Sequence, residues 1–349
     1  MTKSLRFILV TLLFANLLAA CAGPTAAPTA AAPTVAAPTA APVAAAKLFK
    51  VAVVLPSPHD DLSFSQSMYD ALVKVKKDLG ADKFDFAYSE NLYSVDDAAS
   101  AMRDYASKGY DLVIAHSSLM GSVMPDIAKD FPKTSFAWGT DVDTFESKGI
   151  HNVFAYEARA EQGGYVNGVM AALLSKGKNI GVVGPLETGD AKLYVDGFKL
   201  GVQATDPKAT VNVTWIGTFN DSAKASAAAQ TLVNAGADIL TGSSQAMAGT
   251  VSVAKDKKAL YFGTQADQSS WGSTTVVASQ AYDWSPFIEE MVSLVQSGTL
   301  GGKVFSATLK NGGLVIAYSP DANMPADVKA AADKTIQGIK DGSITVKVP

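Results

Sequence analysis

Residues 49–55, FKVAVVL, followed by residues 63–79, SFSQSMYDALVKVKKDL, decide the fold class of this chain. The first segment is a short apolar run with three valines, which is typical of a strand buried on both faces of a sheet. The second segment places Met68, Leu72 and Val75 at helical spacing. A buried strand followed directly by an amphipathic helix is the repeating unit of an α/β fold.

The same alternation continues through the rest of the chain. Further strands are expected at residues 84–88, 111–115, 134–138, 152–156, 179–183, 210–216, 238–240, 260–262, 275–278, 304–309 and 314–318. Helices are expected between them at residues 95–108, 120–130, 157–175, 191–204, 222–235, 247–256, 285–297 and 326–340. The pattern runs through two successive rounds, which predicts two doubly wound lobes with parallel sheets covered on both faces. Ligands of such sheets bind at the carboxyl ends of the strands, where loops of two lobes can face each other across a cleft.

The N-terminus predicts a lipoprotein signal peptide over residues 1–20. Lys3 and Arg6 precede a nearly unbroken apolar run at residues 7–18, which is too short to span a membrane comfortably and fits a signal peptide. The run leads into LAAC, in which small residues precede Cys21 as lipoprotein signal peptidase requires, so we expect Cys21 to be lipidated. The alternative is an ordinary secretory signal with an incidental cysteine. Because Cys21 is the only cysteine, no internal disulfide is expected.

Residues 22–46 predict a tether that holds a folded part away from the membrane. They contain only Ala, Pro, Thr, Val and one Gly, a composition that cannot bury a core and that favours extended backbone. At about 3.1 Å per residue, such a segment could reach roughly 80 Å. The alternative is a low-complexity insert without a specific role.

The charge of the mature chain argues against a nucleic-acid partner. Removal of residues 1–20 would remove Lys3 and Arg6 and leave 27 Lys and Arg against 33 Asp and Glu, a net charge of −6. The roughly 300 residues beyond the tether are enough for two lobes of ordinary domain size. No second apolar run is long enough to span a bilayer, so the lipid is the only membrane anchor expected.

Sequence signatures of enzymes are scarce in this chain. It contains no G-x-x-x-x-G-K-[ST] phosphate loop, no G-x-G-x-x-G fingerprint and no G-x-S-x-G nucleophile elbow. Its three histidines, His59, His116 and His151, are not at metal-ligand spacing. The cluster His59-Asp60-Asp61 is more typical of ligand contacts or helix capping than of a metal site. His116 follows a strand and either faces the cleft or is an ordinary loop histidine. No metal, no cofactor and no catalytic residue is therefore expected.

Several motifs occur in the order found in one known family. They are Asp61-Leu62-Ser63-Phe64-Ser65-Gln66-Ser67-Met68-Tyr69, Glu161-Gln162-Gly163-Gly164-Tyr165-Val166-Asn167-Gly168, Asn179-Ile180-Gly181-Val182-Val183-Gly184, Gly197-Phe198-Lys199-Leu200-Gly201-Val202, Gly217-Thr218-Phe219-Asn220-Asp221 and Gly263-Thr264-Gln265-Ala266-Asp267-Gln268. This order resembles the basic membrane protein family, the substrate-binding lipoproteins of purine nucleoside ABC transporters. The resemblance implies a type I periplasmic-binding-protein fold, with two three-layer lobes joined by three crossovers. Residues 47–157 and 282–349 are then assigned to lobe 1, and residues 158–281 to lobe 2.

The resemblance also implies which residues bind the ligand. Aromatic residues at the positions of Phe64 and Phe219 sandwich the purine in the family, and each stack of an aromatic side chain on a base contributes about 1–3 kcal/mol. Asp61 either contacts the ligand or caps the first helix, and the two roles are compatible. The remaining candidates flank these positions or follow later strands: Ser63, Ser65, His116, Gly263, Gln265 and Trp284.

Departures from the family pattern bear on the identity of the ligand. The asparagine that follows the phenylalanine in the family is Ser65 here, and the ribose-binding aspartate is Gln265. The downstream lysine has no clear counterpart, since residues 279–284, SQAYDW, occupy that region. Trp284 either adds a flat wall to the cleft or packs between the lobes. A smaller planar ligand such as a free purine base therefore becomes an alternative to a nucleoside.

These observations predict a capture protein rather than an enzyme. It would bind a purine base or nucleoside between its lobes, remain anchored on the extracytoplasmic side as a monomer, and deliver the ligand to an ABC permease and its ATPase. The alternatives are a sensor domain for another membrane protein and a nucleoside hydrolase. A hydrolase would require clustered carboxylates at strand ends, for which Asp60, Asp61 and Asp267 are the candidates.

Overall fold

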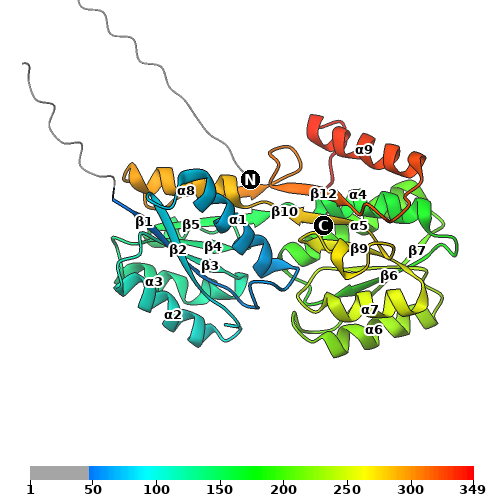
Figure 1. Ribbon diagram of the computed structural model, residues 1–349, viewed down its shortest axis with the longest axis horizontal. Helices are drawn as coiled ribbons and strands as arrows, with labels where there is room; N and C mark the ends of the chain where they lie inside the picture. The colour runs from blue at the N-terminus through cyan, green and yellow to red at the C-terminus, as the bar shows by residue number, and fades with distance from the viewer. Residues whose placement is uncertain (1–46) are drawn as a thin grey trace, which may run out of the picture. The chain divides into compact units, whose positions relative to one another are not determined.

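The computed structural model describes residues 47–349, and the predicted signal peptide and tether lie outside the described residues. The described residues contain two sheets of six strands each, and helices flank both sheets (Figure 1). No helix within this range is long and apolar enough to cross a membrane. The α/β fold class with two lobes, predicted from the strand–helix alternation, is confirmed.

Lobe 1 is built on a fully parallel sheet with the strand order β11-β5-β4-β3-β1-β2. Its strands are β1 (Phe49–Val54), β2 (Phe84–Ser89), β3 (Leu112–His116), β4 (Ser135–Gly139), β5 (Val153–Ala158) and β11 (Val304–Ala307). Helices α1 (Phe64–Leu79) and α8 (Ser285–Gln296) cover one face, and α2 (Val95–Ser107) and α3 (Met124–Asp130) cover the other (Figure 1). Strands β3 and β4 are buried at every residue, which agrees with their mostly apolar sequences.

Lobe 2 has the strand order β12-β10-β9-β8-β6-β7. Its strands are β6 (Asn179–Gly184), β7 (Thr210–Trp215), β8 (Ile239–Gly242), β9 (Leu260–Gln265), β10 (Val276–Tyr282) and β12 (Leu314–Tyr318). Helices α4 (Ala160–Leu174), α5 (Gly189–Thr205) and α9 (Ala326–Asp341) lie on one face, and α6 (Ser222–Asn234) and α7 (Met247–Lys257) on the other (Figure 1). The prediction of wholly parallel sheets is wrong for β12, which pairs antiparallel with β10.

The chain passes between the lobes three times, as the resemblance implies. The crossings lie between β5 and α4, between β10 and α8, and between β11 and β12. The third crossing differs from the assignment of residues 282–349 to lobe 1. Strand β12 completes the edge of the second sheet and α9 packs on α4, so the tail from Leu314 belongs to lobe 2. Strands β11 and β12 are short and follow each other closely, and nothing in their sequences indicates that they enter different sheets.

Glycines bring helices α4 and α5 into unusually close contact. A Cβ atom on Gly164 or Gly168 would lie 2.3 or 2.2 Å from a backbone oxygen of α5. A Cβ atom on Gly197 or Gly201 would lie 2.2 or 2.1 Å from a backbone oxygen of α4. Only glycine permits this approach, so these parts of the family-like motifs serve helix packing within lobe 2.

Candidate functional site

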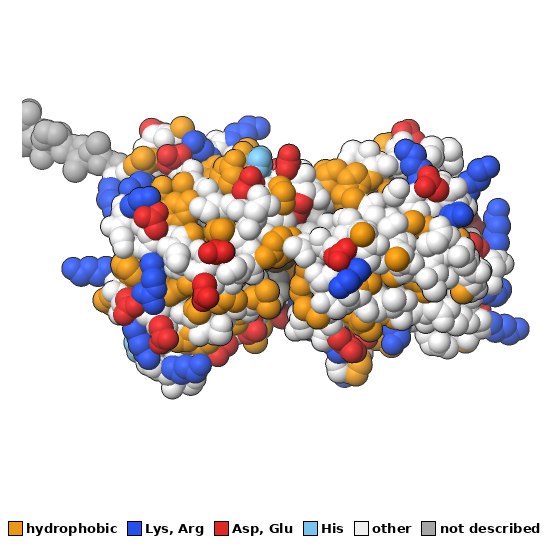
Figure 2. All heavy atoms as spheres, turned by 90° about the horizontal axis from the view of Figure 1, so that it is seen from below, with side chains coloured by type: hydrophobic (Ala, Val, Ile, Leu, Met, Phe, Trp, Pro, Cys, Tyr) orange, Lys and Arg blue, Asp and Glu red, His pale blue; other side chains and the backbone are white. Residues whose placement is uncertain are grey.

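A pocket lies between the lobes, at the carboxyl ends of the parallel strands. It holds roughly 480 Å³ of empty space, part of which is open to solvent. Its walls are formed by Pro56, Phe64, Tyr93, Ser117, Ser118, Leu119 and Thr140 of lobe 1, and by Thr188, Gly189, Asp190, Phe219, Gln245 and Gln265 of lobe 2. On the face seen in Figure 2, the molecule narrows between the lobes, and hydrophobic side chains lie on both sides of the narrowing. The position of the pocket agrees with the general location of ligands in doubly wound sheets.

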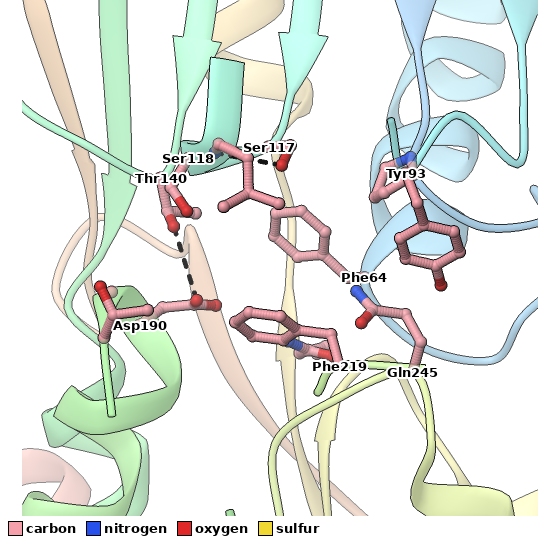
Figure 3. Close-up of a pocket in the computed structure, with 13 residues that line it drawn as sticks. Phe64, Tyr93, Ser117, Ser118, Thr140, Asp190, Phe219 and Gln245 are labelled. Atoms are coloured by element: carbon pink, nitrogen blue, oxygen red, sulfur yellow. Dashed lines mark hydrogen bonds between the residues drawn. The ribbon is translucent and has the colours of Figure 1, made fainter. Parts of the chain in front are cut away.

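Phe64 and Phe219 reach this pocket from opposite lobes. Phe64 is the first residue of α1, and Phe219 lies in the loop that follows β7. Both rings point into the same space (Figure 3). Phe64 is 6% exposed, whereas Phe219 is half-buried. The structure therefore brings together the two aromatic side chains that the sequence singles out.

His116 supports Phe64 from behind and does not line the pocket. The two rings stack with their centroids 3.8 Å apart and an interplanar angle of 10°. The His116 Nε2 atom lies 2.9 Å from the Phe64 carbonyl oxygen, and its Nδ1 atom lies 2.7 Å from the Tyr156 hydroxyl. Burial lowers the pKa of His116 to about 3. The expectation that it faces the cleft is replaced by a role in orienting Phe64.

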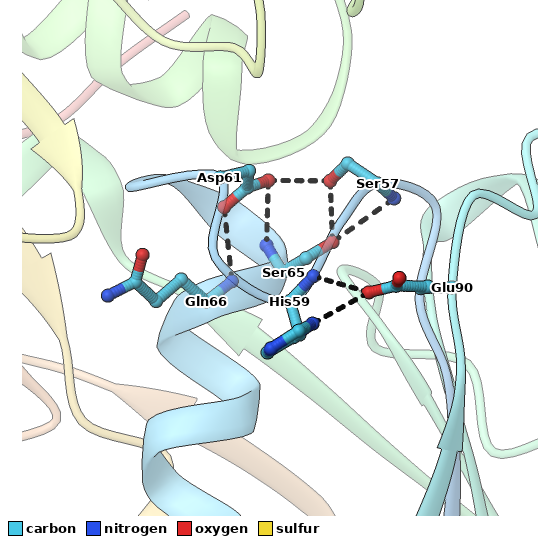
Figure 4. Close-up of polar contacts among 6 residues, drawn as sticks. All are labelled: Ser57, His59, Asp61, Ser65, Gln66 and Glu90. Carbon is cyan, nitrogen blue, oxygen red and sulfur yellow. Dashed lines mark hydrogen bonds and ion pairs between the residues drawn. The ribbon is translucent and has the colours of Figure 1, made fainter.

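Asp61 caps the start of helix α1 (Figure 4). It is not part of the pocket wall. Its carboxylate accepts hydrogen bonds from the Ser57 hydroxyl at 2.5 Å and from the amides of Ser63, Gln66 and Ser65 at 2.8, 3.1 and 3.3 Å. Burial raises the pKa of Asp61, although these hydrogen bonds oppose the rise. Of the two predicted roles, helix capping is the one that the geometry supports.

Ser65 belongs to the same capping network. Its hydroxyl lies 2.6 Å from the Ser57 hydroxyl and accepts a hydrogen bond from the Ser57 amide at 3.2 Å. The side chain is completely buried and lies outside the pocket wall. Beside this network, His59 binds Glu90 through both its amide and its ring, at 2.9 and 2.8 Å (Figure 4). Ser65 therefore organises the first turn of α1 instead of facing the pocket.

Ser63 and Gln265 join the two lobes at the inner edge of the pocket. The Ser63 hydroxyl lies 2.5 Å from Gln265 Oε1 and 3.2 Å from the Ser244 carbonyl oxygen. Nearby, the Gln268 amide donates to the Leu62 carbonyl at 3.0 Å. Gln265 also lines the pocket, but Ser63 does not. The predicted role of Ser63 as a ligand contact is replaced in this structure by a contact between lobes.

Gly263 and Trp284 lie away from the pocket wall. Gly263 lies within β9, where a Cβ atom would come 2.4 Å from the Ser279 hydroxyl and 2.8 Å from Gln268 Oε1. Trp284 is 1% exposed and donates from Nε1 to the Ser67 hydroxyl at 2.9 Å. It packs in the core against Tyr156, so the alternative of a packing tryptophan describes it better than that of a flat wall.

The pocket contains a carboxylate that sequence reasoning missed. Asp190 is the second residue of α5, and its Oδ2 atom accepts a hydrogen bond from the Tyr282 hydroxyl at 2.8 Å. Its Oδ1 atom lies 3.5 Å from the Thr140 hydroxyl of the other lobe (Figure 3). Burial raises the pKa of Asp190, while hydrogen bonds from Tyr282 and Gln265 oppose the rise. A usable signal was present, because Thr188-Gly189-Asp190 stands at the junction of a strand and a helix.

Most other wall residues also follow strand ends. Ser117 and Ser118 follow β3, Thr140 follows β4, and Gln245 follows β8. Tyr93 lies in the loop after β2, and burial raises the pKa of its hydroxyl. The rule that ligands collect at strand ends points to each of these loops, but it does not select the side chain within a loop.

The family of the chain follows from comparison with known proteins. The model of the Bmp family, described as PnrA-like ABC transporter substrate-binding proteins, matches residues 48–347. The chain belongs to this family. Bmp proteins are extracytoplasmic substrate-binding components of ABC transporters, so membership implies a small ligand and an ABC permease.

Individual relatives agree with membership of the Bmp family. A purine-binding protein of Brucella abortus is 28% identical over 300 residues, which cover 86% of this chain and 83% of the relative. The nucleoside-binding protein BmpA of an ABC transporter in Lactococcus lactis is 24% identical over 307 residues, which cover 82% of this chain and 85% of the relative. The structure of an ABC transporter solute-binding protein from Conexibacter woesei matches with a TM-score of 0.70 at 22% identity, covering 86% of this chain and 99% of that one. This match shows that the chain and the Conexibacter woesei protein have the same fold.

Proposed function

We propose that this chain is a lipid-anchored, monomeric binding protein that captures a purine base or purine nucleoside in the pocket between its lobes. It would hand the unchanged ligand to an ABC permease. The observation that carries the proposal is that Phe64 and Phe219 line one pocket from opposite lobes. Rings on two sides suit a flat heterocycle, and closure of the lobes around it excludes water.

Two further observations support this reading. The names of two relatives refer to purine binding in Brucella abortus and nucleoside binding in Lactococcus lactis. The stack of His116 on Phe64 holds one ring face in place before a ligand arrives, and a preorganised wall reduces the entropy lost on binding. Capture followed by closure requires no catalytic residue.

Binding of purines by variants of the two phenylalanines tests the proposal. We expect the protein without residues 1–46 to bind adenine, hypoxanthine, adenosine or inosine in isothermal titration calorimetry. Phe64→Ala and Phe219→Ala should each weaken binding by about 10- to 100-fold, because each removes one base stack. Phe219→Trp should retain binding, since it preserves an aromatic face.

The matched control is Phe86→Ala, which removes a partly buried ring of lobe 1 outside the pocket. It should leave the dissociation constant unchanged. Absence of binding to every purine base and nucleoside, or equal binding by all four variants, would contradict the proposal. Release of free base from inosine during the titration would instead support the nucleoside hydrolase.

One observation favours a second candidate function, in which the pocket senses a ligand for another protein. A relative from Bacillus subtilis that is 26% identical over 257 residues is named as the transcriptional activator Med. A sensor and a transport protein would bind the same ligand and close in the same way. Uptake of radiolabelled purine by cells with and without this chain separates them, because only the transport protein is needed for uptake.

A further inference from the structure

Asp190 is the only charged residue on the wall of the pocket as described within residues 47–349. Asp190 is 7% exposed and stands at the N-terminal end of α5. A helix N-terminus stabilises a negative charge, and the Tyr282 hydroxyl donates a hydrogen bond to Oδ2. No Lys, Arg or His of the described chain lines this pocket, and Lys192, which lines an adjoining cavity beside Asp190, is paired with Asp196.

The protein already supplies several donors to the carboxylate of Asp190. The Tyr282 hydroxyl donates to Oδ2, and hydrogen bonds from Gln265 and from the amides of Asp190 and Ala191 also act to lower its pKa. A carboxylate can accept about four hydrogen bonds. Within the described chain, the hydroxyl of Thr140 approaches Oδ1 only to 3.5 Å, the outer limit of a hydrogen bond. Because Asp190 lines the pocket and its Oδ1 contact with Thr140 is long, a ligand that supplies a well-placed donor to Oδ1 would be favoured at this position.

The opposite end of the pocket presents a second acceptor. The Oε1 atom of Gln245 is buried and has no hydrogen-bond partner within the described residues. Figure 3 shows Asp190 on one side of the rings of Phe64 and Phe219, with Gln245 and Tyr93 on the other. A flat ligand between the rings would therefore meet an acceptor at each of two edges.

We propose that Asp190 is the specificity-determining residue of this pocket, and that its carboxylate accepts a hydrogen bond from an N–H or O–H group on the edge of an uncharged planar ligand. This inference rests on the proposed function and narrows its ligand class to unphosphorylated purines. A phosphate group inside this pocket would bring negative charge towards the carboxylate, and no cation lines the pocket to compensate for it, so nucleotides should bind more weakly. The donor is either a ring N–H of a free base or a ribose hydroxyl.

Replacement of Asp190 by Asn tests the inference. The variant preserves the shape of the side chain and an oxygen that accepts from Tyr282, but it replaces the other acceptor with an NH₂ donor. We expect wild-type protein to bind adenine or adenosine and to bind adenosine monophosphate far more weakly. Asp190→Asn should lower the affinity for the favoured ligand by about 10- to 100-fold, because the variant loses a hydrogen bond to a charged group.

Three ligands identify the donor by calorimetry. If a ring N–H binds Asp190, 9-methyladenine should bind the wild type as weakly as adenine binds Asp190→Asn. If a ribose hydroxyl binds Asp190, adenosine should bind the wild type more tightly than adenine or 9-methyladenine does. Asp190→Asn should then lower the affinity for adenosine more than the affinity for the other two. Both results support the inference, because each assigns the accepted proton to the ligand.

The matched control is Glu187→Gln, which removes an exposed negative charge three residues away, outside the pocket wall. It should bind like the wild type, and all variants should show the same circular dichroism spectrum. Unchanged purine affinity in Asp190→Asn would overturn the inference and leave the proposed function intact. If the wild type bound no purine base or nucleoside, the proposed function would itself fail and the inference with it.

Discussion

The protonation state of His116 follows from its two neighbours. The Phe64 carbonyl oxygen has no proton to donate, so the His116 Nε2 atom must carry the hydrogen that joins them. The Nδ1 atom is then unprotonated and accepts from the Tyr156 hydroxyl. The imidazole is therefore neutral, uses both nitrogens, and presents a flat face to the Phe64 ring. His116 thus orients both the backbone and the ring of Phe64.

Neutral His116 predicts a loss of stability in mild acid. The pKa of histidine is about 6.5 in the unfolded chain, whereas burial lowers it to about 3 in the fold. Above about pH 6.5 neither state binds this proton, and the stabilisation is fully present. Below that pH only the unfolded state binds it, so the free energy of unfolding should fall by about 1.4 kcal/mol per pH unit until about pH 3.

Urea unfolding between pH 7.5 and 5 measures this loss. His116→Gln should be less stable than the wild type at pH 7.5, because the stack is lost, but its stability should fall less as the pH decreases. The control is His151→Gln, since that side chain is 74% exposed. Parallel stability curves for wild type and His116→Gln would show that His116 does not contribute the acid sensitivity.

Aspartates just before two helices of this fold accept hydrogen bonds from the first turn, and their different surroundings give a prediction. Asp61 is partly buried and accepts four hydrogen bonds just before α1, whereas Asp221 accepts one amide hydrogen bond, from Lys224 at 2.9 Å, at the start of α6. Asp61→Ala should lower the free energy of unfolding by about 2 kcal/mol and Asp221→Ala by about 1 kcal/mol or less. Asp61→Asn should cost less than Asp61→Ala, because its amide oxygen still accepts from the backbone and burial already disfavours the charge. Chemical denaturation of the three variants checks this order, and equal losses for the two alanine variants would contradict it.

Regular elements were predictable because burial leaves a periodic pattern in the sequence. The expected helix at residues 63–79 begins one residue later, at Phe64, and the expected strand at residues 49–55 ends one residue earlier, at Val54. Phe64 and Phe219 were predictable as members of one pocket because both follow strands in motifs of known order. The pairing of β12 with β10 was not, because a five-residue edge strand carries no mark of its partner.

The pocket was less predictable than the elements because its walls combine separate loops. Asp190 stands at a helix start, where an aspartate is ordinarily explained by the helix alone. Its position beside Thr140 depends on how the two lobes meet, and that geometry has no local pattern. His116 and Trp284 follow strands as ligand-binding residues do, yet both are turned into the interior and have buried partners.

The two lobes of the whole molecule are held together across the pocket by few side-chain hydrogen bonds. The Ser63 hydroxyl donates to Gln265 and Ser244, the Gln268 amide donates to the Leu62 carbonyl, and the Thr140 hydroxyl makes a long contact with Asp190. Leu62 and Ser63 lie just before α1, Ser244 follows β8, and Gln265 and Gln268 lie at and just after the end of β9. Because three crossing segments form the only covalent link between the lobes of residues 47–349, these contacts favour the closed arrangement without locking it.

Removal of the Ser63 hydroxyl should therefore shift the balance between open and closed lobes. Ser63→Ala leaves Gln265 Oε1 without its 2.5 Å partner and should destabilise the closed arrangement by about 1–2 kcal/mol, which weakens purine binding by roughly 10-fold. Small-angle X-ray scattering should show a larger radius of gyration for the ligand-free variant than for the wild type, and saturating ligand should remove the difference. The control is Ser67→Ala on the same helix, whose hydroxyl binds Trp284 within lobe 1, so its cost should appear in unfolding and not in the scattering. If Ser63→Ala scattered and bound like the wild type, the contact between the lobes would have no part in closure.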